Sequence, residues 1–210
     1  KNVETFSSSS SPAKTASTGS TPTCSAPSFQ HFHEPRLSQP VVQLLSLSHG
    51  KFFCNGFDLD WVNAAGSDEE TQQRFNLLLD YLKQLVLAFI SLPMPTIAAV
   101  NAHAAAGGVV LALCHEYDYV LMRRNRSVLY MIDLDLGIKI PEPFMALFRA
   151  KISGSARRDL LLRGLKIKGE EALKMGIVEA VYDGEEEVTN AGIKMADDLA
   201  KRNWHGEVYA

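Results

Sequence analysis

The chain has 210 residues, of which 46% are hydrophobic and 21% are charged, an ordinary composition for a globular protein. Its net charge of −3 gives no electrostatic basis for binding nucleic acid or an anionic membrane surface. The longest apolar region, residues 85–114, contains two prolines, an asparagine and a histidine, so we expect no membrane-spanning helix.

The three cysteines, Cys24, Cys54 and Cys114, show no spacing typical of a metal site. Because their number is odd, we expect free thiols in a reducing compartment and hence an intracellular chain. The sequence therefore predicts no metal site.

The N-terminal segment, residues 1–37, is rich in serine, threonine and proline and lacks periodic apolar residues. Such a segment buries too little apolar surface to offset the loss of chain entropy on folding. We therefore expect residues 1–37 to be disordered or foreign to the domain, and residues 38–210 to form one domain.

Two short apolar runs open this domain. Residues 41–47 form a β-compatible run that ends in a turn. Residues 51–59 follow and contain Gly56, whose conformational freedom marks a tight turn after a second short strand.

A long amphipathic helix is predicted over residues 66–93. Ser67 and Glu70 form a capping box at its start, and two prolines end it. Its apolar stripe consists of Phe75, Leu78, Leu82, Leu85, Val86 and Phe89.

A strand is predicted over residues 95–102, followed by a helix that opens with Gly107 and Gly108. The next strand, residues 117–124, completes a βαβ-type unit, so the fold class is α/β. Beyond this unit the sequence predicts three helices, within residues 153–164, 168–176 and 184–203, and a short strand over 177–182.

The two glycines at the start of a helix have two interpretations. A helix that opens after a strand presents unpaired backbone N–H groups and the positive end of its dipole to an anion. A phosphate loop would need GxxxxGK[ST] or GxGxxG, and a hydrolase elbow would need a nucleophile at the turn, but the sequence has neither. The pair therefore belongs to an oxyanion hole, or it only lets the helix approach the strand closely. Gly56 favours the oxyanion hole, because the following N–H, that of Phe57, would supply a second donor.

The runs HGKFFCNGFDL, PTIAAVNAHAAAGG and LGIKIP, in this order and at these spacings, resemble the crotonase (enoyl-CoA hydratase/isomerase) superfamily. GEEALKMGIVEAVYD and KRNWHGEVYA resemble in particular its plant peroxisomal Δ3,Δ2-enoyl-CoA isomerases. The resemblance covers roughly residues 38–210 and implies a crotonase-like (ββα) spiral core. It also implies an acyl-CoA thioester substrate, no separate cofactor because coenzyme A is part of that substrate, and a homo-oligomer built from trimers.

The resemblance further implies roles for individual residues. In this superfamily two backbone N–H groups hold the thioester oxygen while a carboxylate moves a proton. By motif, the first donor is Phe57 and the second is Gly107. The expected substrate-binding residues are Gly56, Asp58, Gly108 and Lys51.

Some of these residues also have purely structural interpretations. Asp58 is expected to tie down the loop that carries Phe57, and His103 is interpreted as structural. Lys51 and His49 either lie near the phosphates of coenzyme A or form an ordinary surface turn.

The carboxylates discriminate between hydration and isomerisation. Hydratases of the superfamily carry a Glu where this chain has Val110, and another where it has Asp133, four residues before Gly137. A single acid suits isomerisation, in which one base takes a proton from C2 and returns it at C4. Asp133 is one methylene shorter than the Glu of the isomerases it resembles, which withdraws the carboxylate by roughly 1 Å. Glu142 is the alternative base, although the run IPEPF is also typical of a solvated helix start.

The resemblance thus predicts a peroxisomal enoyl-CoA isomerase of unsaturated fatty-acid β-oxidation. The alternatives are a catalytically impaired acyl-CoA-binding or oligomer-partner relative, and another crotonase-type reaction such as thioester hydrolysis. Relatives have further strands where this chain has residues 1–37, and a final helix after the position where it ends. We therefore expect a core without its first strands and without the end of its C-terminal helical region. Because the final Val-Tyr-Ala is not a peroxisomal signal, a cytoplasmic location is the alternative.

Overall fold

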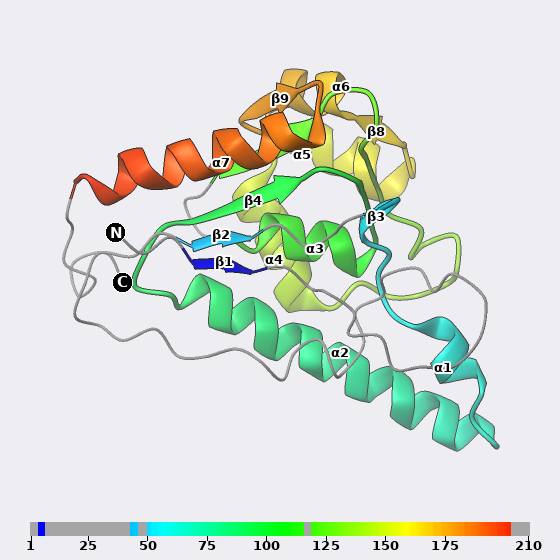
Figure 1. Cartoon of the computed structure of the whole chain (residues 1–210). Coiled ribbons are helices and arrows are strands. Elements are labelled where there is room, and N and C mark those ends of the chain that lie inside the picture. The colour runs from blue at the N-terminus through cyan, green and yellow to red at the C-terminus, as the bar shows by residue number, and fades with distance from the viewer. Residues whose placement is uncertain (1–3, 7–42, 46–49, 116–118, 203–210) are drawn as a thin grey trace.

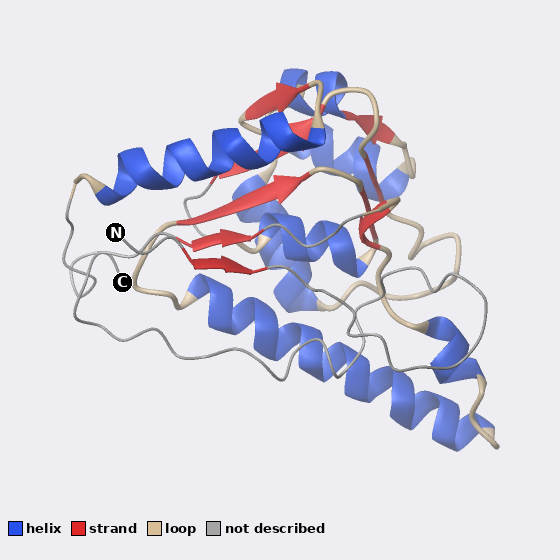
Figure 2. Ribbon diagram, viewed as in Figure 1, coloured by secondary structure: helices blue, strands red, loops and turns tan. Residues whose placement is uncertain are grey.

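The computed structural model of the chain describes residues 4–6, 43–45, 50–115 and 119–202. Its strands form two sheets, and helices pack against them (Figure 1). In Figure 2 the larger sheet lies at the centre of the molecule, and strands of the smaller sheet run across its end at a steep angle.

The large sheet has five strands, and all of its pairs are parallel. Every residue of its central strand, β4, is buried. This agrees with its nearly continuous apolar run, because parallel sheets are covered on both faces. The strands, in spatial order, are β1 (Glu4–Phe6), β2 (Gln43–Leu45), β4 (Thr96–Val100), β6 (Tyr119–Arg123) and β9 (Ala180–Tyr182).

The small sheet has four strands, of which the first three are parallel and the last is antiparallel. The chain passes twice through the same order of elements: a strand of the large sheet, a strand of the small sheet and then a helix. The first pass is β4, β5 and α3, and the second is β6, β7 and α4. This is the ββα spiral that the family resemblance implies. The small sheet consists of β3 (Phe52–Cys54), β5 (His103–Ala105), β7 (Val128–Tyr130) and β8 (Ile167–Lys168), and the two helices are α3 (Gly107–Leu113) and α4 (Glu142–Lys151).

The predicted strand over residues 95–102 and its βαβ unit need a correction. The chain turns after β4, where the Asn101 N–H donates to the carbonyl of Ala99 at 3.1 Å, and it then forms β5 in the other sheet. Apolar residues continue through this turn because both strands are buried, so periodicity alone does not reveal the break.

The predicted long helix is α2 (Asp68–Ile90), and its capping residues act much as expected. The Ser67 hydroxyl accepts from the N–H of Glu70 at 3.2 Å. The Glu70 carboxylate bonds back to the N–H of Gly66, one residue before the capping position, at 2.8 Å. Four residues of the predicted stripe are fully buried, namely Leu78, Leu82, Val86 and Phe89.

The C-terminal part contains the three predicted helices, the first of them in two short pieces. Residues 153–164 form a short helical turn, α5 (Gly154–Arg157), and a π-helical turn, η2 (Arg158–Leu162). α6 (Gly169–Lys174) is followed by Gly176, which has φ +66°. The N–H groups of Gly176 and Ile177 bond back to Leu173 and Ala172, as in a Schellman motif.

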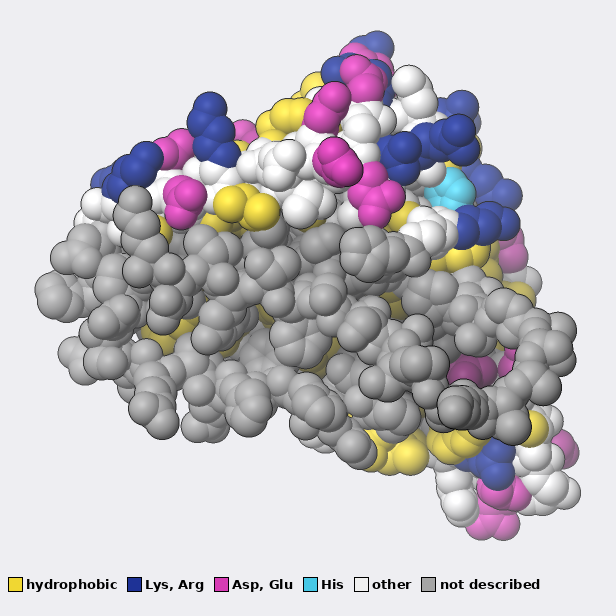
Figure 3. Space-filling view, viewed as in Figure 1, with side chains coloured by type: hydrophobic (Ala, Val, Ile, Leu, Met, Phe, Trp, Pro, Cys, Tyr) yellow, Lys and Arg dark blue, Asp and Glu magenta, His cyan; other side chains and the backbone are white. Residues whose placement is uncertain are grey.

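α7 (Glu185–Ala200) lies along one side of the large sheet, and α2 lies on the other (Figure 1). A small apolar cluster under α7 consists of Ile97, Ala99, Leu121, Val188 and Ala196. Lysine, arginine, aspartate and glutamate side chains are interspersed on the outer surface around α7 (Figure 3). Among the described residues, no helix combines the length and hydropathy needed to span a bilayer.

Two expectations from the sequence differ from the structure. Within the predicted disordered segment, Glu4–Phe6 forms an edge strand paired with β2; the rest of residues 1–37 lies outside the described residues. The expectation of free thiols is wrong for Cys54, which is disulfide-bonded, whereas Cys114 is a buried thiol outside any disulfide that donates to the carbonyl of Leu111 at 3.1 Å.

Candidate active site

The turn after β3 carries the N–H of Phe57. Gly56 has φ +82°, a left-handed conformation that favours glycine. Asp58 then caps the short helix α1 (Leu59–Asn63), because its carboxylate accepts from the N–H of Trp61 at 3.0 Å. The backbone on both sides of Phe57 is therefore fixed by local chemistry.

The turn after β5 is strained at a residue that is not glycine. Ala106 has φ 47° and ψ −114°, a conformation that L-residues rarely adopt. Its N–H donates to the carbonyl of Tyr130 at 3.0 Å. Its own carbonyl accepts from the N–H groups of Val109 and Val110 at 2.9 and 3.3 Å. These bonds hold the strained residue in place and direct the chain into α3 at Gly107.

The two turns lie directly against each other. A Cβ on Gly56 would lie 3.5 Å from the backbone nitrogen of Gly107, and a Cβ on Gly108 would lie 2.2 Å from the carbonyl oxygen of Cys54. Gly108 therefore serves close helix–strand packing. The Gly107 N–H has no carbonyl partner within its helix, and it donates none of the turn, loop and cap hydrogen bonds found among the described residues.

Asp133 faces the same region from the turn after β7. This turn is closed by the Ile138 N–H, which donates to the Asp133 carbonyl at 2.7 Å. The side chain is partly buried, and its Oδ2 has no hydrogen-bond partner within the part of the chain that the structure describes. Burial raises the pKa of the Asp133 carboxyl above its ordinary value, and a hydrogen bond from its own backbone N–H offsets part of this rise.

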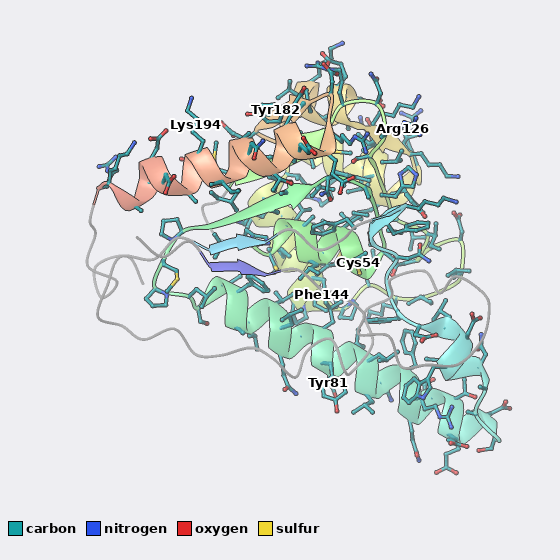
Figure 4. The ribbon with its side chains drawn as sticks, in the orientation of Figure 1. Cys54, Tyr81, Arg126, Phe144, Tyr182 and Lys194 are labelled. Atoms are coloured by element: carbon teal, nitrogen blue, oxygen red, sulfur yellow. The ribbon has the colours of Figure 1, made fainter. Side chains whose placement is uncertain are left out.

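Phe57, Gly107 and Asp133 line one pocket of about 640 Å³, part of it open to solvent. Val110 also lines it, so the position where a hydratase would carry a second Glu is apolar. Most of the wall is apolar as well; Figure 4 shows Phe144 of α4 between that helix and α2. The other apolar wall residues are Leu59, Phe75, Leu79, Leu82, Ala106, Met131, Ile132, Leu136, Ile138, Ile140 and Pro141.

The remaining predicted residues lie outside the pocket lining. Asp58 caps α1, Gly108 packs on β3, and Gly56 lies against Ala105 and Ala106 of the facing turn. Lys51 is exposed, with its ammonium 5.4 Å from the ring centre of Phe52. Asp58, Gly56 and Gly108 therefore have structural roles, and Lys51 does not line the pocket. His49 lies outside the described residues.

Glu142 and His103 also stay away from the pocket. The Glu142 side chain is 75% exposed, begins α4 and pairs with Arg149 at 2.5 Å. This ion pair lowers the pKa of the Glu142 carboxyl, as a solvated helix start predicts. His103 packs edge-on against the ring of Phe52, and burial, followed by the charge of Lys51, lowers its pKa.

Sequence reasoning did not identify three residues of the site. Asn55 and Lys139 line the pocket, and Ala106 forms the strained turn. Strain at an alanine leaves no trace in composition or spacing. Lys139 follows Gly137 inside the recognised run LGIKIP, which is the one signal that would have pointed to it.

Residues 25–206 match the family model described as Enoyl-CoA hydratase/isomerase. The chain belongs to the enoyl-CoA hydratase/isomerase family. The predicted resemblance to this family, and the crotonase-like fold that it implies, are thereby confirmed.

Relatives in this family include two proteins of Arabidopsis thaliana. The chain is 52% identical to "Enoyl-CoA delta isomerase 2, peroxisomal" and 49% identical to "Enoyl-CoA delta isomerase 3". Each alignment covers 80% of this chain, with 70% of the first relative and 69% of the second.

Solved structures of the family share the fold. A probable enoyl-CoA hydratase of Mycobacterium tuberculosis superposes with a TM-score of 0.67 at 21% identity, over 76% of this chain and 64% of that one. An enoyl-CoA hydratase of Bacillus anthracis gives a TM-score of 0.67 at 23% identity, over 76% and 58%. The chain thus spans less than two thirds of the length of these two structures.

Proposed function

We propose that the chain is an enoyl-CoA isomerase that converts a 3-enoyl-CoA into the 2-trans-enoyl-CoA in unsaturated fatty-acid β-oxidation. The single observation that carries the proposal is the partly buried carboxylate of Asp133, with its unpartnered Oδ2 in a pocket where Val110 replaces a second acid. The names of the two Arabidopsis relatives, both enoyl-CoA delta isomerases, support the same reaction.

In the proposed reaction the thioester oxygen accepts hydrogen bonds from the N–H groups of Phe57 and Gly107. Asp133 takes a proton from C2, and the electron pair left behind forms a dienolate whose negative charge rests on that oxygen. The protonated Asp133 returns the proton to C4, so that the double bond moves from C3–C4 to C2–C3. No atom is gained or lost, and no separate cofactor is required, because coenzyme A is part of the substrate.

The surroundings of Asp133 suit this role. Burial raises its pKa, and a carboxylate with a raised pKa is a stronger base toward a carbon acid. The apolar side chain of Val110 offers no group that activates water, which disfavours hydration of the product.

The test is the conversion of 3-cis-enoyl-CoA, followed by the ultraviolet absorbance of the conjugated 2-trans product. We expect Asp133→Ala to lose about 10²-fold or more of kcat, the usual contribution of a general base. Asp133→Glu restores the longer side chain and is expected to raise kcat, because a displacement of about 1 Å matters at this point. The matched control is Asp135→Ala, at an exposed carboxylate in the same turn.

A different outcome would favour the binding-only relative. If the parent chain binds acyl-CoA but does not turn it over, and Asp133→Glu restores nothing, the isomerase proposal is wrong. Formation of a free acid and free coenzyme A would instead identify a thioester hydrolase.

We further propose a homo-oligomer built from trimers and a peroxisomal location. Exposed leucines such as Leu134 and Leu136, each 51% exposed, provide apolar surface that association would bury. The printed name of one of the two relatives includes the word peroxisomal. Sedimentation velocity tests the assembly, and fluorescence microscopy of the tagged natural protein tests the location.

A further inference from the structure

One face of α2 lines the pocket and packs against the turn that carries the Phe57 N–H. The ring of Phe75, on α2, packs edge-on against the ring of Phe57, with ring centres 5.8 Å apart and planes at 85°. Both rings line the pocket. α2 therefore contacts Phe57 directly. The residue before Phe75 on α2, Arg74, contacts α1, the helix that follows Phe57 in the chain.

Arg74 makes three contacts with two residues, Trp61 and Glu70. Its Nη1 donates to the carbonyl of Trp61 at 2.7 Å, and its guanidinium carbon lies 5.0 Å from the centre of the Trp61 ring. Its Nη2 pairs with the Glu70 carboxylate at 2.6 Å, and that carboxylate accepts from the Gly66 N–H at 2.8 Å. One side chain thus joins α1, the loop that follows α1, and α2.

The chemistry of these contacts needs a guanidinium. The Trp61 carbonyl belongs to the last turn of α1, where helix carbonyls lack intrahelical donors, and an arginine can supply one. A planar guanidinium donates in two directions while stacking on an aromatic ring, which a lysine ammonium does not do. The Arg74 side chain is 25% exposed, whereas its partners Trp61 and Glu70 are 39% and 44% exposed.

Little chain separates this clamp from the donor. α1 begins at Leu59, two residues after Phe57, and the Leu59 N–H donates to the Phe57 carbonyl at 3.0 Å. The bonded carbonyl belongs to the Phe57–Asp58 peptide, which adjoins the peptide that carries the Phe57 N–H, so α1 is coupled to the donor through a single residue.

We infer that Arg74 is a positioning residue for the oxyanion hole, which fixes the direction of the Phe57 N–H by holding α1 against α2. This inference rests on the proposed function, because it takes Phe57 as a donor to the thioester oxygen. Arg74 itself does not line the pocket and makes no contact with substrate in this scheme.

The test compares Arg74→Met and Arg74→Lys with a matched control, Arg163→Met. Arg163, the cap residue after η2, also pairs with a carboxylate four residues earlier, Asp159 at 3.2 Å, but it lies far along the chain from the Phe57 turn. The first measurement is the infrared stretching frequency of the carbonyl of bound 2-trans-enoyl-CoA, labelled with ¹³C at C1. This frequency reports hydrogen bonding to the thioester oxygen and would not change through a loss of stability alone.

We expect Arg74→Met to move this frequency toward its value in water and to lower kcat by about 10- to 100-fold, with a smaller change in KM. Arg74→Lys keeps the charge beside Glu70 but not the bond to Trp61, so we expect it to recover part of the loss. Arg163→Met is expected to match the parent. All variants are assayed well below their unfolding midpoints, so that the folded fraction is the same.

The inference is overturned if Arg74→Met has the same carbonyl frequency and the same kcat as Arg163→Met. The infrared measurement needs no turnover and thus separates this inference from the proposed function. Suppose that the parent chain polarises the carbonyl without isomerising the substrate, and that Arg74→Met loses this polarisation. The positioning role of Arg74 would then stand, and only the isomerase proposal would be contradicted.

Discussion

At the scale of single residues, Asp133 is a side chain whose placement opposes folding. Its carboxylate is partly buried, and no donor among the described residues bonds its Oδ2. Burying an ionised group without a partner destabilises the folded state. Such a residue is expected where activity, and not stability, sets the side chain.

We predict that Asp133→Asn stabilises the folded chain at neutral pH while abolishing isomerisation. Burial raises the folded pKa of Asp133, so the folded state holds this proton more tightly than the unfolded state does. The stability from the protonated group is therefore complete below the unfolded pKa and is lost as the pH rises through the folded pKa. The unfolding midpoint of Asp133→Asn should exceed that of the parent at pH 7, and the difference should shrink at acidic pH.

The control for this prediction is Asp135→Asn, which removes the same charge from an exposed side chain of the same turn. A gain in midpoint that is equal in both variants, or independent of pH, would contradict the account of Asp133 burial.

At the scale of elements, the site depends on how closely the first turn of α3 approaches the end of β3. A Cβ on Gly108 would lie 2.2 Å from the carbonyl oxygen of Cys54, a backbone atom that is not free to move aside. The Gly107 N–H takes its position from the same packing.

We predict that Gly108→Ala costs about 3 kcal/mol or more of the free energy of unfolding, because the added methyl group collides with backbone. Gly154→Ala is the control, since a Cβ there meets nothing closer than 3.9 Å. That variant should stay within about 1 kcal/mol of the parent in urea denaturation. A mild effect of Gly108→Ala would mean that α3 and β3 separate easily.

The elements differ in how far the sequence predicts them. α2 is predicted to within two residues at its start and three at its end, because Ser67, Glu70 and its apolar stripe act within one helix. The break between β4 and β5 is not predicted, because two buried strands in succession leave no change of period. The strain at Ala106 arises from hydrogen bonds to Tyr130 and the start of α3, which no local pattern encodes.

At the scale of the whole molecule, the spiral brings the three site residues together from three successive turns. Phe57 follows β3, Gly107 follows β5 and Asp133 follows β7, and these strands are neighbours in the small sheet. The glycines already pointed to Phe57 and Gly107 as candidate donors, whereas the proposed role of Asp133 was predictable only through the family resemblance, because residues 57, 107 and 133 are too far apart in sequence for spacing alone to join them. The separation of Lys51 and Glu142 from the pocket likewise required the three-dimensional structure.

Both sheets and the helices contribute residues to the core that supports this arrangement. Phe148 of α4 is fully buried within it. We predict that Phe148→Ala costs about 3–5 kcal/mol of the free energy of unfolding, through lost burial and the cavity left behind. Leu162→Ala, at a side chain that is 72% exposed, should change it by no more than about 0.5 kcal/mol. Equal effects of the two variants in urea denaturation would contradict the packing described for α4.

The most direct test of the central claim follows the proton that Asp133 is proposed to move. 3-cis-enoyl-CoA carrying deuterium at C2 is incubated with the chain in ordinary water, and the product is analysed by mass spectrometry. A single carboxylate that shuttles the proton predicts 2-trans-enoyl-CoA with part of the deuterium retained at C4, and almost no product with Asp133→Ala. Unchanged turnover by Asp133→Ala, or a hydrated product, would contradict the account.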